Sequence, residues 1–223
     1  MNIIHPVRVK VACIRDAEEA RRAVSFGAAA IGMAAENPSG GPSLTEDEIQ
    51  AVTESVPDSV GTFLMTTRQS APDLARLARN TGVNTLQLWD EPEPDAYAHL
   101  RSVIPGLSIV QSIAVVGHGA VDRAIEVASL VDALVLDSAH RAAPARWEQQ
   151  HGLTHDWQLS RRITEEVGIP VILSGGLNHR NVGDAIRAVR PYGVEVCTGV
   201  RTRGALDTAL LVQFLEGLER INP

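Results

Sequence analysis

Two adjacent glycines, Gly175 and Gly176, follow the apolar run VIL and one serine in the last quarter of the chain, and a segment with helical spacing begins a few residues later. Glycine lets a backbone approach a ligand closely, and the first N–H groups of a helix lack backbone partners. A strand, a glycine turn and a helix in this order can therefore bind a phosphate. A tight turn without a ligand is the alternative reading of the same two residues.

These glycines lie within a pattern that repeats along the chain, in which a short apolar run precedes a longer amphipathic segment. Apolar runs predict strands at residues 8–14, 29–33, 61–65, 85–89, 108–113, 133–136, 170–173 and 193–197. Apolar spacing of about 3.6 residues predicts helices at residues 17–26, 46–55, 71–80, 94–103, 121–130, 157–167, 180–189 and 206–218. The alternation predicts a single (β/α)₈ TIM barrel over residues 1–223, with a doubly wound sheet as the alternative.

In a barrel of this type the strand order gives the glycines a defined place. Ligands bind at the carboxyl ends of the strands, and a phosphate site is often formed by the loops after the seventh and eighth strands. Gly175 and Gly176 follow the seventh predicted strand, and Thr198 and Gly199 follow the eighth. Two small-residue turns at these two places predict phosphate binding.

The composition narrows the class of protein. Hydrophobic residues make up 44% of the 223 residues and charged residues 21%, which is typical of a folded globular chain. The net charge of −7 and the lack of long basic runs argue against nucleic acid as a partner. We find no apolar stretch of membrane-spanning length and no signal-like segment after Met1, so we expect a cytoplasmic protein.

The chain has two cysteines, Cys13 and Cys197, and both lie in apolar runs that predict strands. Their spacing matches no zinc-binding pattern. A cytoplasmic location favours reduced thiols. We therefore expect two free thiols rather than a disulfide.

Several longer segments resemble the phosphoribosylanthranilate isomerase family, whose members perform an Amadori rearrangement in tryptophan synthesis. The similar segments are VKVACIRDAEEARRAVSFGAAAIGM, VGTFLM, TLQLWDE, LVLDS, HDW, ILSGGLNHRNVGDAI and PYGVEVCTGVRTRGALD. The resemblance implies that Gly175, Gly176, Thr198 and Gly199 hold the substrate phosphate and that Asp137 is the general acid. It also implies a small phosphosugar substrate. We expect no cofactor and no bound metal, and a monomer or a homodimer.

The residue that the family uses as general base is absent from its usual place. The family's first strand reads V-K-I-C-G-I-T, which puts Ala12 where the basic cysteine stands and Cys13 where glycine stands. Side chains alternate along a strand, so Cys13 should point outward if Lys10 and Ala12 point into the barrel. Cys13 could then replace the base only if a bulge reversed its direction.

Other departures gather at the rim of the same predicted site. Ser39 stands at the position where the family has an arginine that binds the anthranilate carboxylate. Trp89 and Asp90 replace histidine and glycine, and His151 and Arg201 occupy two further rim positions. The sequence therefore predicts an enzyme with a changed substrate or reaction.

Three alternatives stay open. The original isomerase activity could persist with Cys13 or Cys197 as a relocated base, since Cys197 shares a face with Glu195 and the eighth strand neighbours the first. A non-catalytic phosphosugar-binding barrel is the second. The third is a metal site formed by Asp137 with three histidines, His140, His151 and His155. Lys10 and Glu195 are predicted to form a buried ion pair, with either a structural or a functional role.

Overall fold

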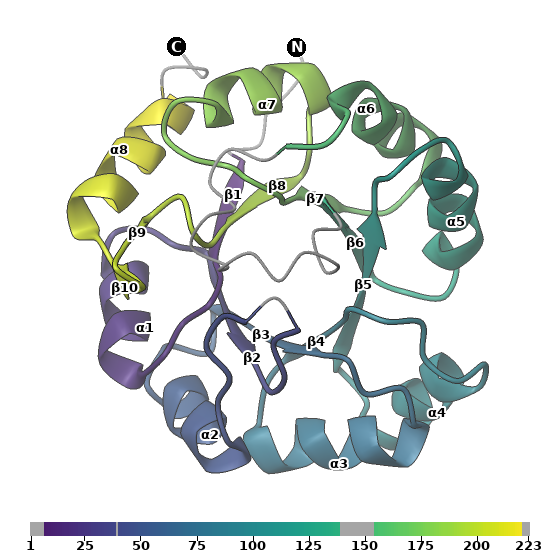
Figure 1. The fold of residues 1–223 in the computed structure, drawn as a ribbon. Coiled ribbons are helices and arrows are strands. Elements are labelled where there is room, and N and C mark those ends of the chain that lie inside the picture. The colour runs from purple at the N-terminus through teal and green to yellow at the C-terminus, as the bar shows by residue number, and fades with distance from the viewer. Residues whose placement is uncertain (1–6, 39, 139–153, 220–223) are drawn as a thin grey trace.

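The computed structural model describes residues 7–38, 40–138 and 154–219, which form a closed barrel of eight parallel strands ringed by eight helices (Figure 1). The strands are β1 (Arg8–Val11), β2 (Ala30–Ala34), β3 (Gly61–Thr66), β4 (Thr85–Leu88), β5 (Ser108–Ala114), β6 (Ala133–Asp137), β7 (Val171–Leu173) and β8 (Gly193–Val196). The helices are α1 (Ala17–Ser25), α2 (Glu46–Glu54), α3 (Ala71–Thr81), α4 (Ala96–Val103), α5 (Gly119–Ala128), α6 (Trp157–Glu166), α7 (Val182–Val189) and α8 (Thr208–Glu219). The TIM-barrel prediction is confirmed, and each predicted strand and helix overlaps an observed one.

Local sequence explains where several helices begin and end. The Asp16 carboxylate accepts a hydrogen bond from the Glu19 N–H and so caps α1. Thr45 and Glu48 form a reciprocal capping box at the start of α2. Helix α3 ends at Gly82, whose φ of 66° is the left-handed conformation that glycine adopts most readily. None of the described helices is both long and apolar enough to cross a membrane.

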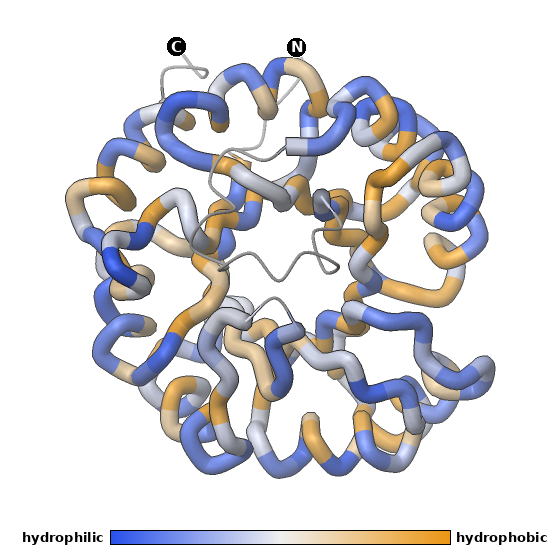
Figure 2. Tube along the Cα trace, viewed as in Figure 1, coloured by the Kyte–Doolittle hydropathy of each residue, from blue (hydrophilic) through white to orange (hydrophobic). Residues whose placement is uncertain are grey.

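Apolar side chains pack in two places, outside and inside the strand ring. The larger core fills the space between the strands and the helices, whose outward faces are mostly hydrophilic (Figure 2). Inside the barrel, Val110, Val135 and Ile172 form an apolar cluster with Phe63. A separate interior cluster joins four buried residues to Trp89 and Cys197; the four are Ala12, Cys13, Ala34 and Met65.

A polar layer inside the barrel is built on Lys10. The Lys10 ammonium pairs with the Glu195 carboxylate at 2.5 Å, donates to the side-chain oxygen of Gln87 and lies 4.3 Å from the centre of the Phe63 ring. Gly32 makes room for this side chain, because a Cβ there would lie 2.8 Å from Lys10 Cε. The predicted buried ion pair of Lys10 and Glu195 is confirmed.

The barrel is closed by the pairing of β1 with β8, in which Lys10 lies opposite Glu195 and Val11 opposite Val196. This register brings the segments after the two strands to the same height at the carboxyl end. Beyond β8 the chain forms a two-stranded antiparallel hairpin that the sequence did not predict, β9 (Arg201–Thr202) and β10 (Ala205–Leu206).

Arg201 begins this hairpin, and its position differs from the predicted one. The sequence predicts Arg201 at the rim as a substrate-binding residue, whereas the structure places its side chain, only 2% exposed, in an ion pair with Glu19 at 2.7 Å. The Arg201 guanidinium also donates to the carbonyl oxygens of Cys13, Ala12 and Gly204. Arg201 is turned toward α1 because a buried carboxylate there compensates its charge.

We expect Arg201→Met to lower the free energy of unfolding by about 3 to 5 kcal/mol, because it removes the buried cation of the Glu19 carboxylate and leaves only the exposed Arg15 side chain, at 3.5 Å. The control is Arg187→Met, which removes a solvent-exposed arginine paired with Asp184 and should change stability by less than about 1 kcal/mol. Urea unfolding of both variants gives the comparison. Equal stability of the two variants would contradict a structural role for Arg201.

Candidate active site

The turns after β6, β7 and β8 pack against one another at the carboxyl end of the barrel. Gly175 and Gly176 both have positive φ, of 88° and 64°. A Cβ on Gly175 would lie 2.1 Å from the Ser138 hydroxyl oxygen, and one on Gly199 would lie 2.0 Å from the Leu177 carbonyl oxygen. Side chains larger than glycine are therefore excluded at both positions, where the backbone of each predicted phosphate turn packs closely against the adjacent turn.

A cavity of about 100 Å³ lies at this end of the barrel and brings most of the predicted site residues together. Its walls include Asp137 from the end of β6, the glycines after β7, Thr198 after β8, and both cysteines; the full lining is Ala12, Cys13, Asn37, Met65, Trp89, Asp137, Ser174, Gly175, Gly176, Leu177, Glu195, Cys197 and Thr198. The lining residues come from seven of the eight strand ends, all except that of β5, which is the usual construction in a TIM barrel.

A second cavity of about 390 Å³ adjoins the first between the loops after β4 and β5. Trp89 and Asp137 line both cavities, and Asp90 and Arg123 line only the second. Arg123 forms an ion pair with Glu91 at 2.8 Å. Of the other predicted rim residues, Ser39 and His151 lie outside the described residues.

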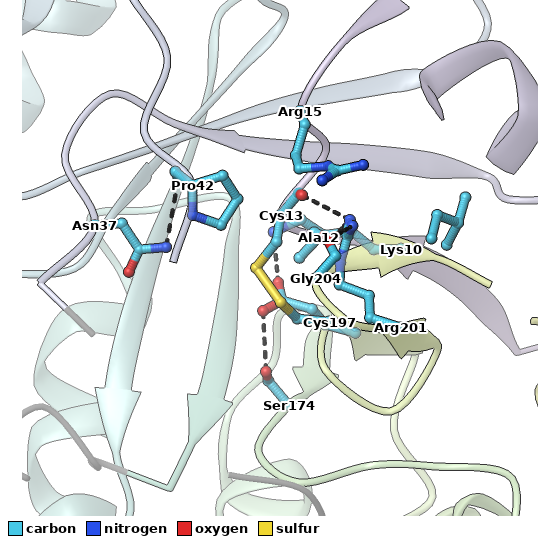
Figure 3. The surroundings of a disulfide bond; sticks show 12 residues. Lys10, Ala12, Cys13, Arg15, Asn37, Pro42, Ser174, Cys197, Arg201 and Gly204 are labelled. Atoms are coloured by element: carbon cyan, nitrogen blue, oxygen red, sulfur yellow. Dashed lines mark hydrogen bonds and ion pairs between the residues drawn. A yellow bond between two sulfur atoms is a disulfide. The ribbon is translucent and has the colours of Figure 1, made fainter. Parts of the chain in front are cut away.

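Cys13 and Cys197 are joined by a disulfide, with their Cα atoms 5.7 Å apart (Figure 3). The expectation of two free thiols is therefore wrong for this structure, and so is the expectation that Cys13 points outward. Strand β1 ends at Val11, and Cys13 has a φ of 62°, so the alternation of side chains along a strand no longer applies to it. In the chain-entropy view, a crosslink between residues 184 positions apart would stabilise the fold by about 5 kcal/mol.

The left-handed conformation of Cys13 is held by contacts other than the disulfide. Arg201 donates hydrogen bonds of 2.6 Å to the Cys13 carbonyl and 3.1 Å to that of Ala12 (Figure 3). The neighbouring N–H of Ile14 donates to the Gly32 carbonyl at 3.0 Å. For a residue with a Cβ this conformation costs about 1 to 2 kcal/mol, which these bonds help to offset.

Asp137 is positioned by the residue that follows it. The Ser138 N–H donates to the Asp137 carboxylate at 2.7 Å. The Ser138 hydroxyl is 3.1 Å from Nδ1 of His155, and Nε2 of the same ring is 2.6 Å from the buried Ser160 hydroxyl on α6. Sequence reasoning considered His155 only as a metal ligand and missed this link, although its place just before α6 sets it beside the end of β6.

Glu195 joins the polar layer of the barrel to the cavity. Its carboxylate accepts a 3.0 Å hydrogen bond from the Ser174 hydroxyl as well as the Lys10 ion pair. Burial lowers the pKa of Lys10, and the facing Glu195 carboxylate opposes this shift. Ser174 was not predicted as a site residue, although it directly precedes the glycine pair.

The arrangement suits proton transfer on a small phosphorylated molecule, since a carboxyl group, two sulfur atoms and a glycine-rich backbone border one cavity. While the disulfide is present, neither cysteine can act as a thiolate base. The described ranges hold no group of three or more histidine, cysteine or acidic side chains placed to bind a metal ion. Of the histidines considered as ligands, His140 and His151 lie outside those ranges.

The fold has close counterparts among solved structures. A phosphoribosyl anthranilate isomerase in complex with reduced 1-(o-carboxyphenylamino)-1-deoxyribulose 5-phosphate superimposes with a TM-score of 0.77 at 23% identity, covering 96% of this chain and 99% of that one. A phosphoribosyl anthranilate isomerase from Thermococcus kodakaraensis gives a TM-score of 0.79 at 26% identity, with coverage of 95% and 98%.

Sequence relatives agree with this likeness. An N-(5'-phosphoribosyl)anthranilate isomerase from Methanosarcina mazei is 33% identical over 211 residues, covering 94% of this chain and 92% of the relative. One from Methanocella arvoryzae is 31% identical over 210 residues, with coverage of 94% and 96%. The profile of the N-(5'phosphoribosyl)anthranilate (PRA) isomerase family matches residues 9–217. The chain belongs to the PRA isomerase family.

Proposed function

We propose that this protein isomerises phosphoribosylanthranilate in tryptophan biosynthesis, with Asp137 as general acid and the thiolate of reduced Cys13 as general base. The observation that carries the proposal is the left-handed conformation of Cys13, which brings this residue into the same cavity as Asp137. Relatives named as PRA isomerases favour this activity over the changed substrate that the sequence departures predict. A cytoplasmic location and a monomeric or homodimeric state remain expectations.

The two proposed roles match the two proton transfers of the reaction. Opening the ribose ring requires a proton at the ring oxygen, and forming the enol requires removal of a proton from the adjacent carbon. Asp137 stands at the end of β6 and Cys13 just beyond β1, so they approach the cavity from different walls. A thiol has an ordinary pKa of about 8.5, within reach of activation at neutral pH.

Cys13 is a better candidate for the base than Cys197. Cys13 directly follows Ala12, the position at which the family sequence carries its basic cysteine. Cys197 directly precedes Thr198 and Gly199, the proposed phosphate turn. The substrate phosphate lies at the opposite end of the pentose from the carbon that loses its proton, so a base should lie away from that turn.

The aromatic half of the substrate is proposed to occupy the 390 Å³ cavity that adjoins the first. Trp89 forms a wall common to both cavities and offers a ring face for stacking. Asp90 and Arg123 border this second space and would contact polar groups of the anthranilate. Arg123 would offer its guanidinium to the anthranilate carboxylate, a role that Ser39 cannot fill at the position of the family's arginine.

For the phosphate turn, we predict that Gly176→Asn abolishes the protection that inorganic phosphate gives against thermal unfolding. Asparagine tolerates positive φ, so the variant should fold while its side chain fills the space at the turn. Gly82→Asn is the matched control, because Gly82 has nearly the same φ of 66° at the end of α3 and no atom within 4 Å of an added Cβ. Phosphate should raise the Tm of the control but not of Gly176→Asn. An equal rise in Tm with phosphate for both variants would rule out the turn at Gly176 as the phosphate site.

For the proton transfers, we predict that the reduced wild-type protein converts phosphoribosylanthranilate and that its gene rescues a tryptophan auxotroph lacking the isomerase. Asp137→Asn and Cys13→Ser should each lower kcat by roughly 10² to 10⁴, the usual contribution of a general acid or base. Turnover is measured in dithiothreitol by the loss of substrate fluorescence. A loss in Cys197→Ser that exceeds the loss in Cys13→Ser would assign the base to Cys197 instead.

For His155, we predict a positioning effect on Asp137 that acts through Ser138. His155→Asn keeps a polar atom near the place of Nδ1 and should retain most of kcat, whereas His155→Phe removes both hydrogen bonds and should lower kcat about tenfold with little change in KM. Steady-state kinetics together with Tm values separate this effect from loss of folded protein. Equal kcat for the two variants would show that the link to Ser138 does not support catalysis.

A further inference from the structure

We propose that Cys13 and Cys197 form a reversible thiol–disulfide exchange site whose reaction partner is a dithiol reductant, and that its state decides whether the enzyme has a general base. This inference rests on the proposed function. It concerns the regulation of the same site, which becomes active only after the disulfide is reduced.

The location of the disulfide is the first argument. Both cysteines line the 100 Å³ cavity that also contains Asp137 and the phosphate turns. A purely structural crosslink between the first and last strands could lie anywhere along their shared edge, which backbone pairing from Arg8 opposite Gly193 to Val11 opposite Val196 already holds. This one lies beyond that pairing, at the carboxyl end of the barrel, where we propose the active site.

The second argument is that oxidation removes what catalysis needs. A general base must be a thiolate, and a sulfur within a disulfide cannot accept a proton from carbon. In this disulfide-bonded form the cavity that both cysteines line measures about 100 Å³, well below the ~300 Å³ lower bound of typical small-molecule pockets. The oxidised protein therefore lacks the base and has restricted room for the pentose.

The third argument is that the site can survive reduction without rearrangement. The carbonyl groups of Ala12 and Cys13 are held by Arg201, which is itself fixed by its ion pair with Glu19. These bonds do not involve sulfur. Cleavage of the disulfide therefore leaves the Cys13 thiol at the cavity in its left-handed conformation.

The exposure of the two cysteines indicates which sulfur the reductant attacks first. Cys13 is buried, at 8% exposure, whereas Cys197 is only partly buried. A reductant thiolate attacks the Cys197 sulfur from the cavity, the sulfur–sulfur bond breaks, and Cys13 leaves as the thiolate. The second reductant thiol then attacks the mixed disulfide and displaces the Cys197 thiolate. Two electrons pass to the protein, the reductant becomes a disulfide, and its two protons are shared between solvent and the new cysteine thiols.

The test combines thiol counting with turnover on the full chain. The protein is equilibrated with either oxidised or reduced dithiothreitol, and free thiols are titrated under denaturing conditions. We expect a reversible change between zero and two thiols per chain. We also expect PRA isomerase turnover at least a hundredfold higher in the reduced form, restored with the same time course as the thiols.

The variant Cys197→Ser shows whether the pairing itself is responsible. It cannot form the disulfide, so its ratio of turnover after the reduced and the oxidised treatment should be close to one. Cys197→Ala, with a side chain that lacks the hydroxyl, should give the same ratio. Full turnover of wild-type protein that has no free thiols would overturn the proposed control of activity by the disulfide. A turnover much higher after the reduced than after the oxidised treatment in both Cys197 variants would overturn it too.

The thiol count keeps this inference separate from the proposed function. If the thiols change reversibly while neither form converts phosphoribosylanthranilate, the exchange site is supported and the proposed isomerase activity fails. If the folded protein keeps its disulfide in excess reduced dithiothreitol, the exchange site is overturned, whatever the turnover.

Discussion

The pairing of β1 with β8 is the constraint on which the site depends. It closes the barrel, and it sets Lys10 opposite Glu195 in a register that continues to Val11 and Val196. Just beyond this pairing, Cys13, two residues after Val11, forms the disulfide with Cys197, one residue after Val196. A slip of this register by one residue would turn the inward side chains of β8 outward, which would separate the ion pair and the cysteines together.

Two buried ion pairs hold the residues around the contact between β1 and β8 in place. The Lys10–Glu195 pair lies inside the barrel, and the Arg201–Glu19 pair lies between the β9–β10 hairpin and α1. Burying such charges is favourable only when hydrogen bonds satisfy their remaining polar atoms. Glu195 gains Ser174, and Glu19 gains the N–H groups of Arg15 and Leu206. Glu195 itself lines the cavity, and Arg201 holds the backbone of Ala12 and Cys13, which line it too.

The same junction explains how a cysteine is accommodated one place after the position where the family carries its base. At that point the backbone has positive φ, a conformation suited to the glycine of the family sequence. Cysteine at this position accepts some backbone strain, and in return its side chain lies at the cavity instead of against the helices. The cost is offset by the hydrogen bonds from Arg201 to the flanking carbonyls.

The sequence by itself determined the barrel and the place of the two small-residue turns proposed to bind phosphate, because these depend on local patterns: the period of apolar residues, helix caps, and small residues just after strands. It also placed Asp137, Trp89 and the inward pair Lys10 and Glu195, since alternation along a strand is local too. Only the tertiary structure decided the disulfide, the burial of Arg201 against Glu19 and the link from His155 to Ser138. These contacts join residues far apart in the chain or follow one residue's left-handed conformation, and no local pattern carries that information.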